Sequence, residues 1–131
     1  MLLLSLERIY SMKIRNLSKS DPHYICYSAQ IPKTLVKKAF GLTICNNFKD
    51  FDGLFFENCR IIHSFFMRFS FDAVFLDADF QVIAIYSDFK PFRISKYIKK
   101  SKYVLELPKG SVKNFEINLH DKLEVITKQN G

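Results

Sequence analysis

The stretch HSFFMRFSFDAVFLD, residues 63–77, is the part of the sequence that decides the fold. Side chains alternate along it with a period of two, which is typical of β-strands. The pattern predicts one strand over residues 60–69 and a second over residues 72–76, joined by a tight turn near residues 69–70. In an antiparallel pairing, His63 and Asp72 would lie on neighbouring strands, close enough for a hydrogen bond.

Further short strands are predicted on both sides of this stretch, separated by turns rich in Pro, Gly, Asp and Ser. They cover residues 13–17, 24–31, 54–56, 81–86, 103–107 and 123–127. Pro32 to Phe40 is expected to form a helix that ends at Gly41, and Ser111 is expected to cap a short helix running to Phe115. Seven to eight short strands with one or two short helices predict a mainly β domain, either a compact sandwich or a partly open barrel.

Length and composition fit one globular domain. The chain has 131 residues, of which 48% are hydrophobic and 25% charged, the proportions of an ordinary soluble protein. Residues 1–11 are expected to be an N-terminal extension and residues 12–131 the single domain, because Met12 is an equally good start. The apolar run at residues 2–4 is too short for a signal peptide or a membrane span. These observations predict a cytoplasmic protein that is a monomer or a weak dimer.

The cysteines show no pattern that indicates a metal or a disulfide framework. Cys26, Cys45 and Cys59 are odd in number, lack CxxC spacing and have no histidine at the distance of a zinc ligand. Reduced thiols are the simplest interpretation, and no metal or cofactor is expected.

His63 and Asp72 are the candidate site. A carboxylate beside an imidazole sets its tautomer and prepares it to bind a ligand or to act as a general base. The alternative is a buried polar pair that fixes the strand register. Ser64 would point to the opposite face from His63, and Cys59 would lie far from His63 along the strand. Neither is therefore a convincing nucleophile.

A basic segment between residues 90 and 102 offers a second candidate site. Its cations interleave with Phe89, Phe92, Tyr97 and Tyr103, so cations could hold phosphates while aromatic rings stack on bases. The alternative is a solvated loop whose aromatic residues anchor it to the core, and no known nucleic-acid motif accompanies the segment. The six cations are Lys90, Arg93, Lys96, Lys99, Lys100 and Lys102.

Three functional hypotheses follow. The first is a non-enzymatic module that binds a small ligand or peptide, with contacts from His63, Asp72, Met67, Phe66 and Arg93. Met67 and the Phe residues around it are also expected to contribute to the core. The second is a hydrolase with His63 as base and Asp72 as its orienting group. The third is nucleic-acid binding through residues 90–102.

Six motifs occur in a fixed order along the chain: AFGL at 39–42, DGLFF at 52–56, HSFFM at 63–67, FDAVFLD at 71–77, KPFR at 90–93 and YVLELPKG at 103–110. Together they resemble the family known as domain of unknown function 192, small proteins of bacteria and archaea, over about residues 39–125. The resemblance implies a compact β-rich domain that is sandwich-like or barrel-like. It implies no reaction.

The chain departs from the family pattern at several positions. Phe66 replaces the usual Trp, which changes any aromatic ligand contact at that point, and Arg68 and Phe69 replace Lys-Asn. Phe80 stands in a hairpin turn where the family usually has Gly, and His120 precedes Asp121 where Gly-Asp is usual. Phe80 is therefore expected either to form another turn type or to occupy a strained region of backbone space.

Overall fold

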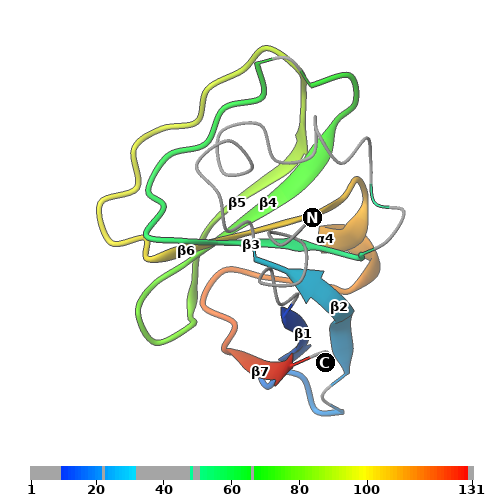
Figure 1. Cartoon of the computed structure of the whole chain (residues 1–131). Helices are drawn as coiled ribbons and strands as arrows, with labels where there is room; N and C mark the ends of the chain where they lie inside the picture. The colour runs from blue at the N-terminus through cyan, green and yellow to red at the C-terminus, as the bar shows by residue number, and fades with distance from the viewer. Residues whose placement is uncertain (1–9, 22, 32–47, 49–50, 66, 130–131) are drawn as a thin grey trace.

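The computed structural model describes residues 10–21, 23–31, 48, 51–65 and 67–129, in which seven strands and one short helix are found. The elements are β1 Tyr10–Asn16, β2 Tyr24–Gln30, β3 Leu54–Glu57, β4 Phe71–Leu76, β5 Val82–Phe89, β6 Tyr103–Pro108, α4 Ser111–Asn114 and β7 Leu123–Gln129. The strands form one sheet in the order β5-β4-β6-β3-β2-β1-β7 (Figure 1). Among these seven described strands, β2 and β3 are the one parallel pair. The sheet is mixed and not closed, and the prediction of a mainly β fold is confirmed.

Some predicted elements differ from those observed. The described residues between 60 and 69 do not form a strand, and among them His63 makes an isolated bridge with Ile94. β1 begins at Tyr10, so two residues of the predicted extension belong to the sheet. The predicted helix at residues 32–40 lies outside the described residues.

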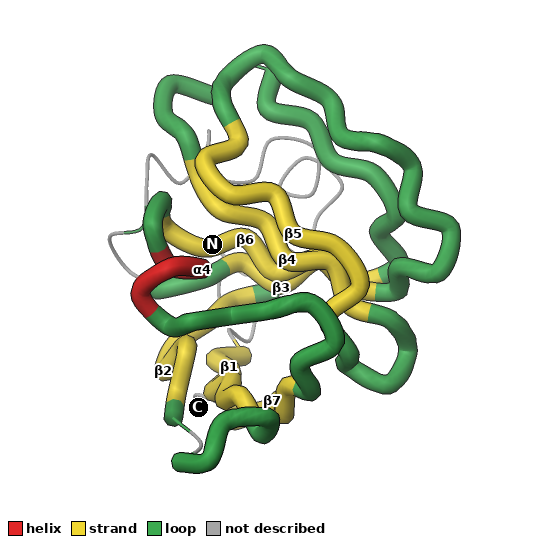
Figure 2. Tube along the Cα trace, turned by 180° about the vertical axis from the view of Figure 1, so that it is seen from behind, coloured by secondary structure: helices red, strands yellow, loops and turns green. Residues whose placement is uncertain are grey.

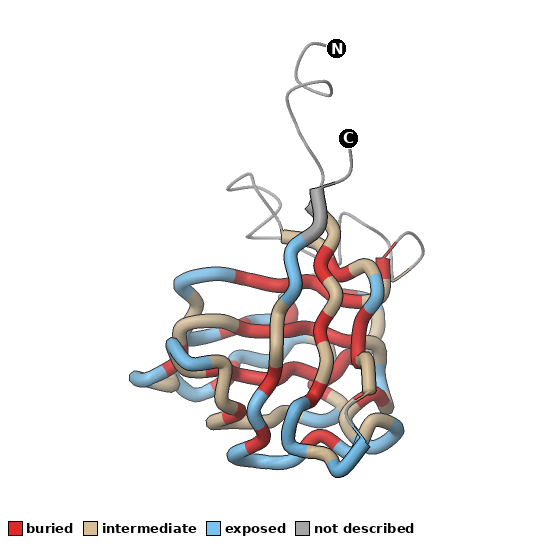
Figure 3. Tube along the Cα trace, turned by 90° about the horizontal axis from the view of Figure 1, so that it is seen from below, coloured by how far each residue is buried: buried red, intermediate tan, exposed pale blue. Residues whose placement is uncertain are grey.

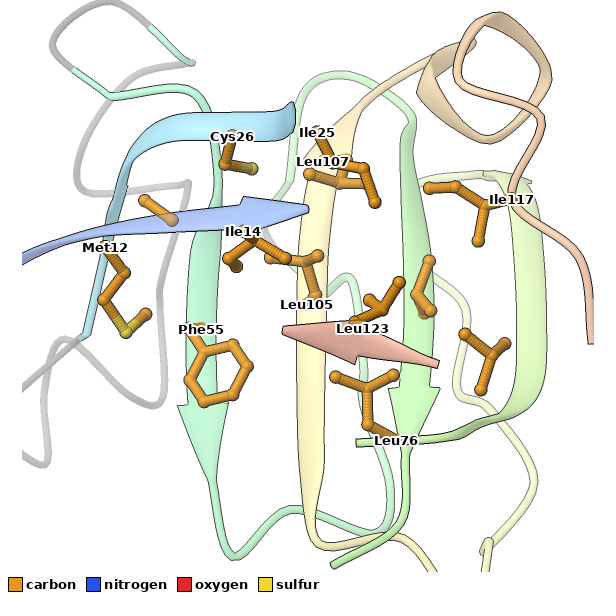
Figure 4. Close-up of a cluster of buried hydrophobic side chains, with 13 residues drawn as sticks. Met12, Ile14, Ile25, Cys26, Phe55, Leu76, Leu105, Leu107, Ile117 and Leu123 are labelled. Carbon is orange, nitrogen blue, oxygen red and sulfur yellow. The ribbon is translucent and has the colours of Figure 1, made fainter. Parts of the chain in front are cut away.

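The two faces of the sheet cover separate cores. Along β6, Leu105 and Leu107 point into the inner core (Figure 4), whereas Val104 and Glu106 point to the outer face. The inner core includes Met12, Ile14, Phe55, Val74, Leu76, Val82 and Leu123. The outer core includes Phe51, Leu54, Phe56, Ile62, Met67, Phe71, Phe75 and Phe89. Figure 3 shows most of the buried positions along the strands and most of the exposed ones in the connections.

The two edges of the sheet approach each other at one end. Gln81 and Lys122 form an isolated antiparallel bridge, and the Val82 N–H donates to the Asp121 carbonyl at 2.8 Å. The Asp121 carboxylate accepts a hydrogen bond from Asn16 at 2.8 Å. Burial opposes ionisation of Asp121, but the hydrogen bonds from Asn16 and Asn118 hold its pKa below the ordinary value. This corner brings the beginnings of β5 and β7 together.

Phe80 and His120 keep the backbone conformation that glycine would favour. Their φ angles are 62° and 74°, in the left-handed region. The Phe80 ring stacks on Tyr103 with centroids 4.8 Å apart. Of the two alternatives for Phe80, the strained backbone is therefore the one observed, and ring packing opposes the cost of the strain.

Gly53 lies where a side chain has no room. A Cβ atom there would lie 2.9 Å from the Cys26 sulfur and 3.3 Å from Leu107 Cδ2. We expect Gly53→Ala to lower the free energy of unfolding by about 1–3 kcal/mol through overpacking, measured by urea denaturation. The double variant Gly53→Ala/Cys26→Ala should lose less unfolding free energy than the sum of the losses of the two single variants, because the closest contact is removed. Strict additivity would contradict this explanation.

Candidate functional site: an exposed aromatic and basic ribbon

His63 and Asp72 do not form the expected hairpin pair. β4, which carries Asp72, has β5 hydrogen-bonded along one edge and β6 along the other. No edge is left for residues 60–69, and His63 instead pairs with Ile94. Asp72 is 1% exposed, whereas His63 is exposed. The predicted pairing is wrong, and the hydrolase hypothesis loses the geometry that motivated it.

Asp72 stabilises a β-bulge in the neighbouring strand. Phe71 pairs with Phe89 and Ala73 with Tyr86, so one extra residue of β5 lies opposite Asp72. Asp88, in this bulge, has a φ of 54° and donates its backbone N–H to Asp72 Oδ1 at 2.9 Å. The carboxylate thus satisfies a donor that the irregular ladder leaves unpaired.

The second oxygen of Asp72 binds the start of helix α4. Asp72 Oδ2 accepts the N–H of Val112 at 2.9 Å. Ser111, which the sequence suggested as the cap, instead donates its hydroxyl to the Pro108 carbonyl at 2.6 Å. Capping by Ser111 was therefore wrong, because a carboxylate from β4 supplies the acceptor.

Two segments outside the sheet run antiparallel to each other, and we call them the basic ribbon: residues 58–65 and 67–69 with residues 90–102. Figures 1 and 2 show them side by side, leaving the sheet after β3 and β5. The Ser64 N–H donates to Arg93 O at 2.8 Å, and the Ser95 N–H donates to Ile62 O at 2.9 Å. These bonds make the ribbon a defined structure although it is not a regular sheet.

The inward side of the basic ribbon holds it to the outer core. Ile62 and Met67 are buried there, packed with residues of β4 and β5. The Ser64 hydroxyl donates to Lys90 O and accepts the N–H of Arg93 at 2.9 Å. Ser64 therefore joins the two segments, and, as expected, it lies on the opposite side from exposed His63.

The outward side of the basic ribbon exposes apolar and aromatic side chains. The bonds at Ser64 and Ser95 flank His63 and Ile94 as a non-hydrogen-bonded pair, the arrangement in which opposed side chains lie closest. The His63 ring stacks on Phe65 with centroids 5.3 Å apart. Of nine large hydrophobic residues exposed in the described part of the chain, five belong to the ribbon: Ile61, Phe65, Phe92, Ile94 and Tyr97.

The charges of the basic ribbon are all of one sign. Residues 58–69 and 90–102 contain eight of the twenty Lys and Arg and none of the thirteen Asp and Glu. The rest of the chain, with twelve cations and thirteen anions, has a formal charge of −1. The excess charge of +7 therefore comes from the ribbon alone. Seven of its cations are exposed, namely Arg60, Arg68, Lys90, Arg93, Lys96, Lys99 and Lys100.

The aromatic residues proposed for this segment divide into two pairs. Phe89 is buried in the outer core, and Tyr103 stacks on Phe55 and Phe80 beside the inner core. Phe92 and Tyr97 are 63% and 64% exposed. The anchoring interpretation thus holds for the first pair, while the second pair is free to contact a ligand.

The other ligand candidates have different positions. Arg93 is exposed on the ribbon and Met67 is buried beneath it. Phe66 lies outside the described residues, as does Cys45. Within the described residues no cluster of three His, Cys, Asp or Glu could hold a metal, and no helix is long and apolar enough to span a bilayer.

Glu106 is a buried carboxyl group that the sequence reasoning did not select. It is 6% exposed and lies between Leu54 and Ala73 of the neighbouring strands. Burial raises the pKa of Glu106 to about 8. Its signal in the sequence is a lone carboxylate in the apolar strand segment VLEL, residues 104–107.

The two described cysteines are free thiols in poorly reactive surroundings. Burial is the main cause that raises the pKa of both the Cys26 and the Cys59 thiol. A raised pKa reduces the thiolate fraction and hence nucleophilic reactivity. Cys59 is accordingly not a convincing nucleophile in this position.

The separate roles of Asp72 and His63 predict unequal effects of substitution. Asp72→Ala should lower the free energy of unfolding by about 2–4 kcal/mol, because two partly buried N–H groups lose their acceptor. His63→Ala, at an exposed position, should change it by no more than about 0.5 kcal/mol. Chemical denaturation measures both. Equal losses would contradict these separate roles.

Burial of Glu106 predicts a pH-dependent stability. The unfolded chain releases the Glu106 proton near the ordinary value of 4.5, the folded chain only near 8. Between these values the folded state holds the extra proton, so stability falls as pH rises. The glutamine of Glu106→Gln does not titrate, so the variant should not lose this stability. The free energy of unfolding of the variant minus that of the natural chain should therefore increase by roughly 3–5 kcal/mol from pH 4.5 to 8.

Thermal unfolding of both proteins across this pH range measures the difference. Glu57→Gln, at an exposed position on β3, is the matched control, and its difference from the natural chain should be nearly constant. A difference for Glu106→Gln that does not change with pH would contradict the assignment.

Sequence comparison finds archaeal relatives. A UPF0127 protein of Pyrococcus abyssi is 34% identical over 101 residues, which cover 75% of this chain and 86% of that protein. A UPF0127 protein of Pyrococcus horikoshii is 35% identical over 66 residues, which cover 50% of this chain and 56% of that protein.

Two crystal structures share the fold at low sequence identity. A protein of unknown function from Novosphingobium aromaticivorans DSM 12444 has a TM-score of 0.71 and 19% identity, covering 86% of this chain and 83% of that chain. A protein from Sinorhizobium meliloti 1021, whose description proposes a transcription regulator, has a TM-score of 0.72 and 20% identity, covering 88% of this chain and 95% of that chain. At these identities the likeness shows the fold alone.

The match to a known protein family extends over most of the chain. The family described as Uncharacterized ACR, domain of unknown function 192, matches residues 17–125, and so begins well before the first motif at residue 39. The match includes all seven strands except β1 and the last residues of β7. The chain therefore belongs to this family of uncharacterized ACR proteins, domain of unknown function 192.

Proposed function

We propose that this chain is a non-enzymatic binding module that holds a polyanionic partner on the outward side of the basic ribbon. The observation that carries the proposal is the coincidence of two properties on one surface. The ribbon has eight cations and no anion, and it also exposes five large hydrophobic residues. Exposed apolar clusters of this kind mark interaction sites more often than isolated exposed residues do.

The proposal keeps the binding hypothesis but changes its residues and its ligand. His63 and Arg93 remain, because both are exposed on the ribbon. Asp72 is not included, since both carboxylate oxygens accept backbone hydrogen bonds. Met67 is not included because it is buried. A cationic surface attracts an anionic partner over the range of a Debye length, about 10 Å at 0.1 M salt.

A charge-removal variant tests the proposal with heparin as the polyanion. Arg93→Ala/Lys96→Ala/Lys100→Ala should elute from a heparin column at clearly lower salt than the natural chain. The logarithm of the binding constant should fall with the logarithm of the salt concentration. If the three side chains contact the polyanion, the magnitude of this slope should be smaller by about 2–3 in the variant, because each contact contributes roughly 0.7–0.9.

A matched control removes three exposed lysines outside the ribbon: Lys109→Ala/Lys113→Ala/Lys122→Ala. Both variants have the same net charge, so only the location of the charges differs. Equal elution of the two variants would show that net charge rather than the ribbon governs binding. Failure of the natural chain to bind at low salt would reject the proposal.

A further inference from the structure

The exposed rings of the basic ribbon give a more specific prediction about its partner. We propose that the polyanion is a single-stranded nucleic acid whose bases stack on Phe92 and Tyr97 while the neighbouring cations contact its phosphates. This inference rests on the proposed function, because it names the chemical class of the partner at the same surface. It adds the requirement that the partner offers planar bases as well as charge.

The positions of the two rings support stacking. Phe92 and Tyr97 lie in the same ribbon segment, and each has more than three-fifths of its surface exposed. Aromatic rings stack on bases with little dependence on sequence, since every base has a planar face. Most of the Phe92 surface is open to solvent, so a base can reach its ring. A base would cover apolar surface that water now contacts.

The opposite segment extends this aromatic surface. Phe65, two residues after His63, is exposed on the first segment of the ribbon like His63 itself. The His63 and Phe65 rings are nearly parallel, with an interplanar angle of 26°. The first segment therefore adds two exposed rings to the surface of the ribbon, on which further bases could stack.

Cations accompany the exposed rings of the second segment. Arg93 follows Phe92 directly, Lys96 precedes Tyr97, and both are exposed. A single strand presents its phosphates and bases together, so this interleaving of charge and rings matches it. A duplex hides its base faces within the helical stack and would meet the charges but not the rings. The exposed ring faces therefore favour a single strand over a duplex.

The absence of Trp from the sequence gives a direct reporter. Phe92→Trp introduces the only tryptophan and keeps an aromatic ring at this position. A labelled oligonucleotide of about 20 nucleotides is long enough, since single-strand sites cover roughly 4–16 nucleotides. We expect it to quench the tryptophan fluorescence of this variant, whereas heparin should not. Tyr27→Trp, at an aromatic position of similar exposure on β2, is the matched control and should not respond.

Affinity measurements with the ring-deletion variant test the energetic role. Loss of one stacked base contact corresponds to about 1–3 kcal/mol, a decrease in affinity of about 5- to 150-fold. Phe92→Ala/Tyr97→Ala should therefore lower the ratio of oligonucleotide to heparin affinity at least about 5-fold. Tyr27→Ala should leave this ratio unchanged. Fluorescence anisotropy with the oligonucleotide, its duplex and heparin gives the ratios, and circular dichroism verifies folding.

The outcomes separate the two proposals. If the ribbon charges control heparin binding but the ring deletions leave the ratio unchanged, the polyanion proposal stands and the single-strand inference is overturned. The inference is also overturned if the duplex binds as tightly as the single strand, or if vesicles of phosphatidylserine and phosphatidylcholine bind while the oligonucleotide does not. If neither heparin nor the oligonucleotide binds at low salt, both proposals are rejected.

Discussion

The buried carboxylate of Asp72 connects the regular sheet to the parts of the chain that leave it. One oxygen accepts the N–H of Asp88 in the bulge of β5, and the other accepts the N–H of Val112 in helix α4. Each donor would cost about 1–3 kcal/mol if it were buried without a partner. The bulge ends the regular pairing of β4 with β5 just before the chain enters the second ribbon segment. The position of the ribbon thus depends on a polar contact on the opposite face of the sheet.

The two faces of the sheet are covered in different ways, and the ribbon covers one of them. The inner core is enclosed by the curled sheet, whose edges approach at Asp121. The outer face is covered by the inward side of the ribbon, through Ile62 and Met67. A covering segment is buried on one side only, so packing does not account for the apolar residues on its other side. Their exposure, together with the uniform charge, is the property that a partner would recognise.

Buried polar groups have separate roles in the two cores. Asp72 is held by backbone donors, and Asp121 has a lowered pKa because hydrogen bonds outweigh its burial. Glu106 lies among apolar side chains, and burial raises its pKa to about 8. The sheet therefore carries carboxyl groups with opposite behaviour toward pH. This difference arises from the donors that each site supplies, since the residue types are chemically alike.

The sequence by itself determined the class of the fold, the family and the strand positions around residues 71–77. Period-two patterns and turn residues are local, so β4, β6 and the hairpin at Phe80 could be predicted from them. The partners of these strands could not, because both edges of β4 are paired, one of them with a segment distant in sequence. The tertiary structure decided that His63 faces Ile94, that Asp72 is structural, and that Glu106 is buried. It also brought two basic segments, separated by about 20 residues of sequence, onto one surface, because strand pairing depends on long-range contacts that no local pattern encodes.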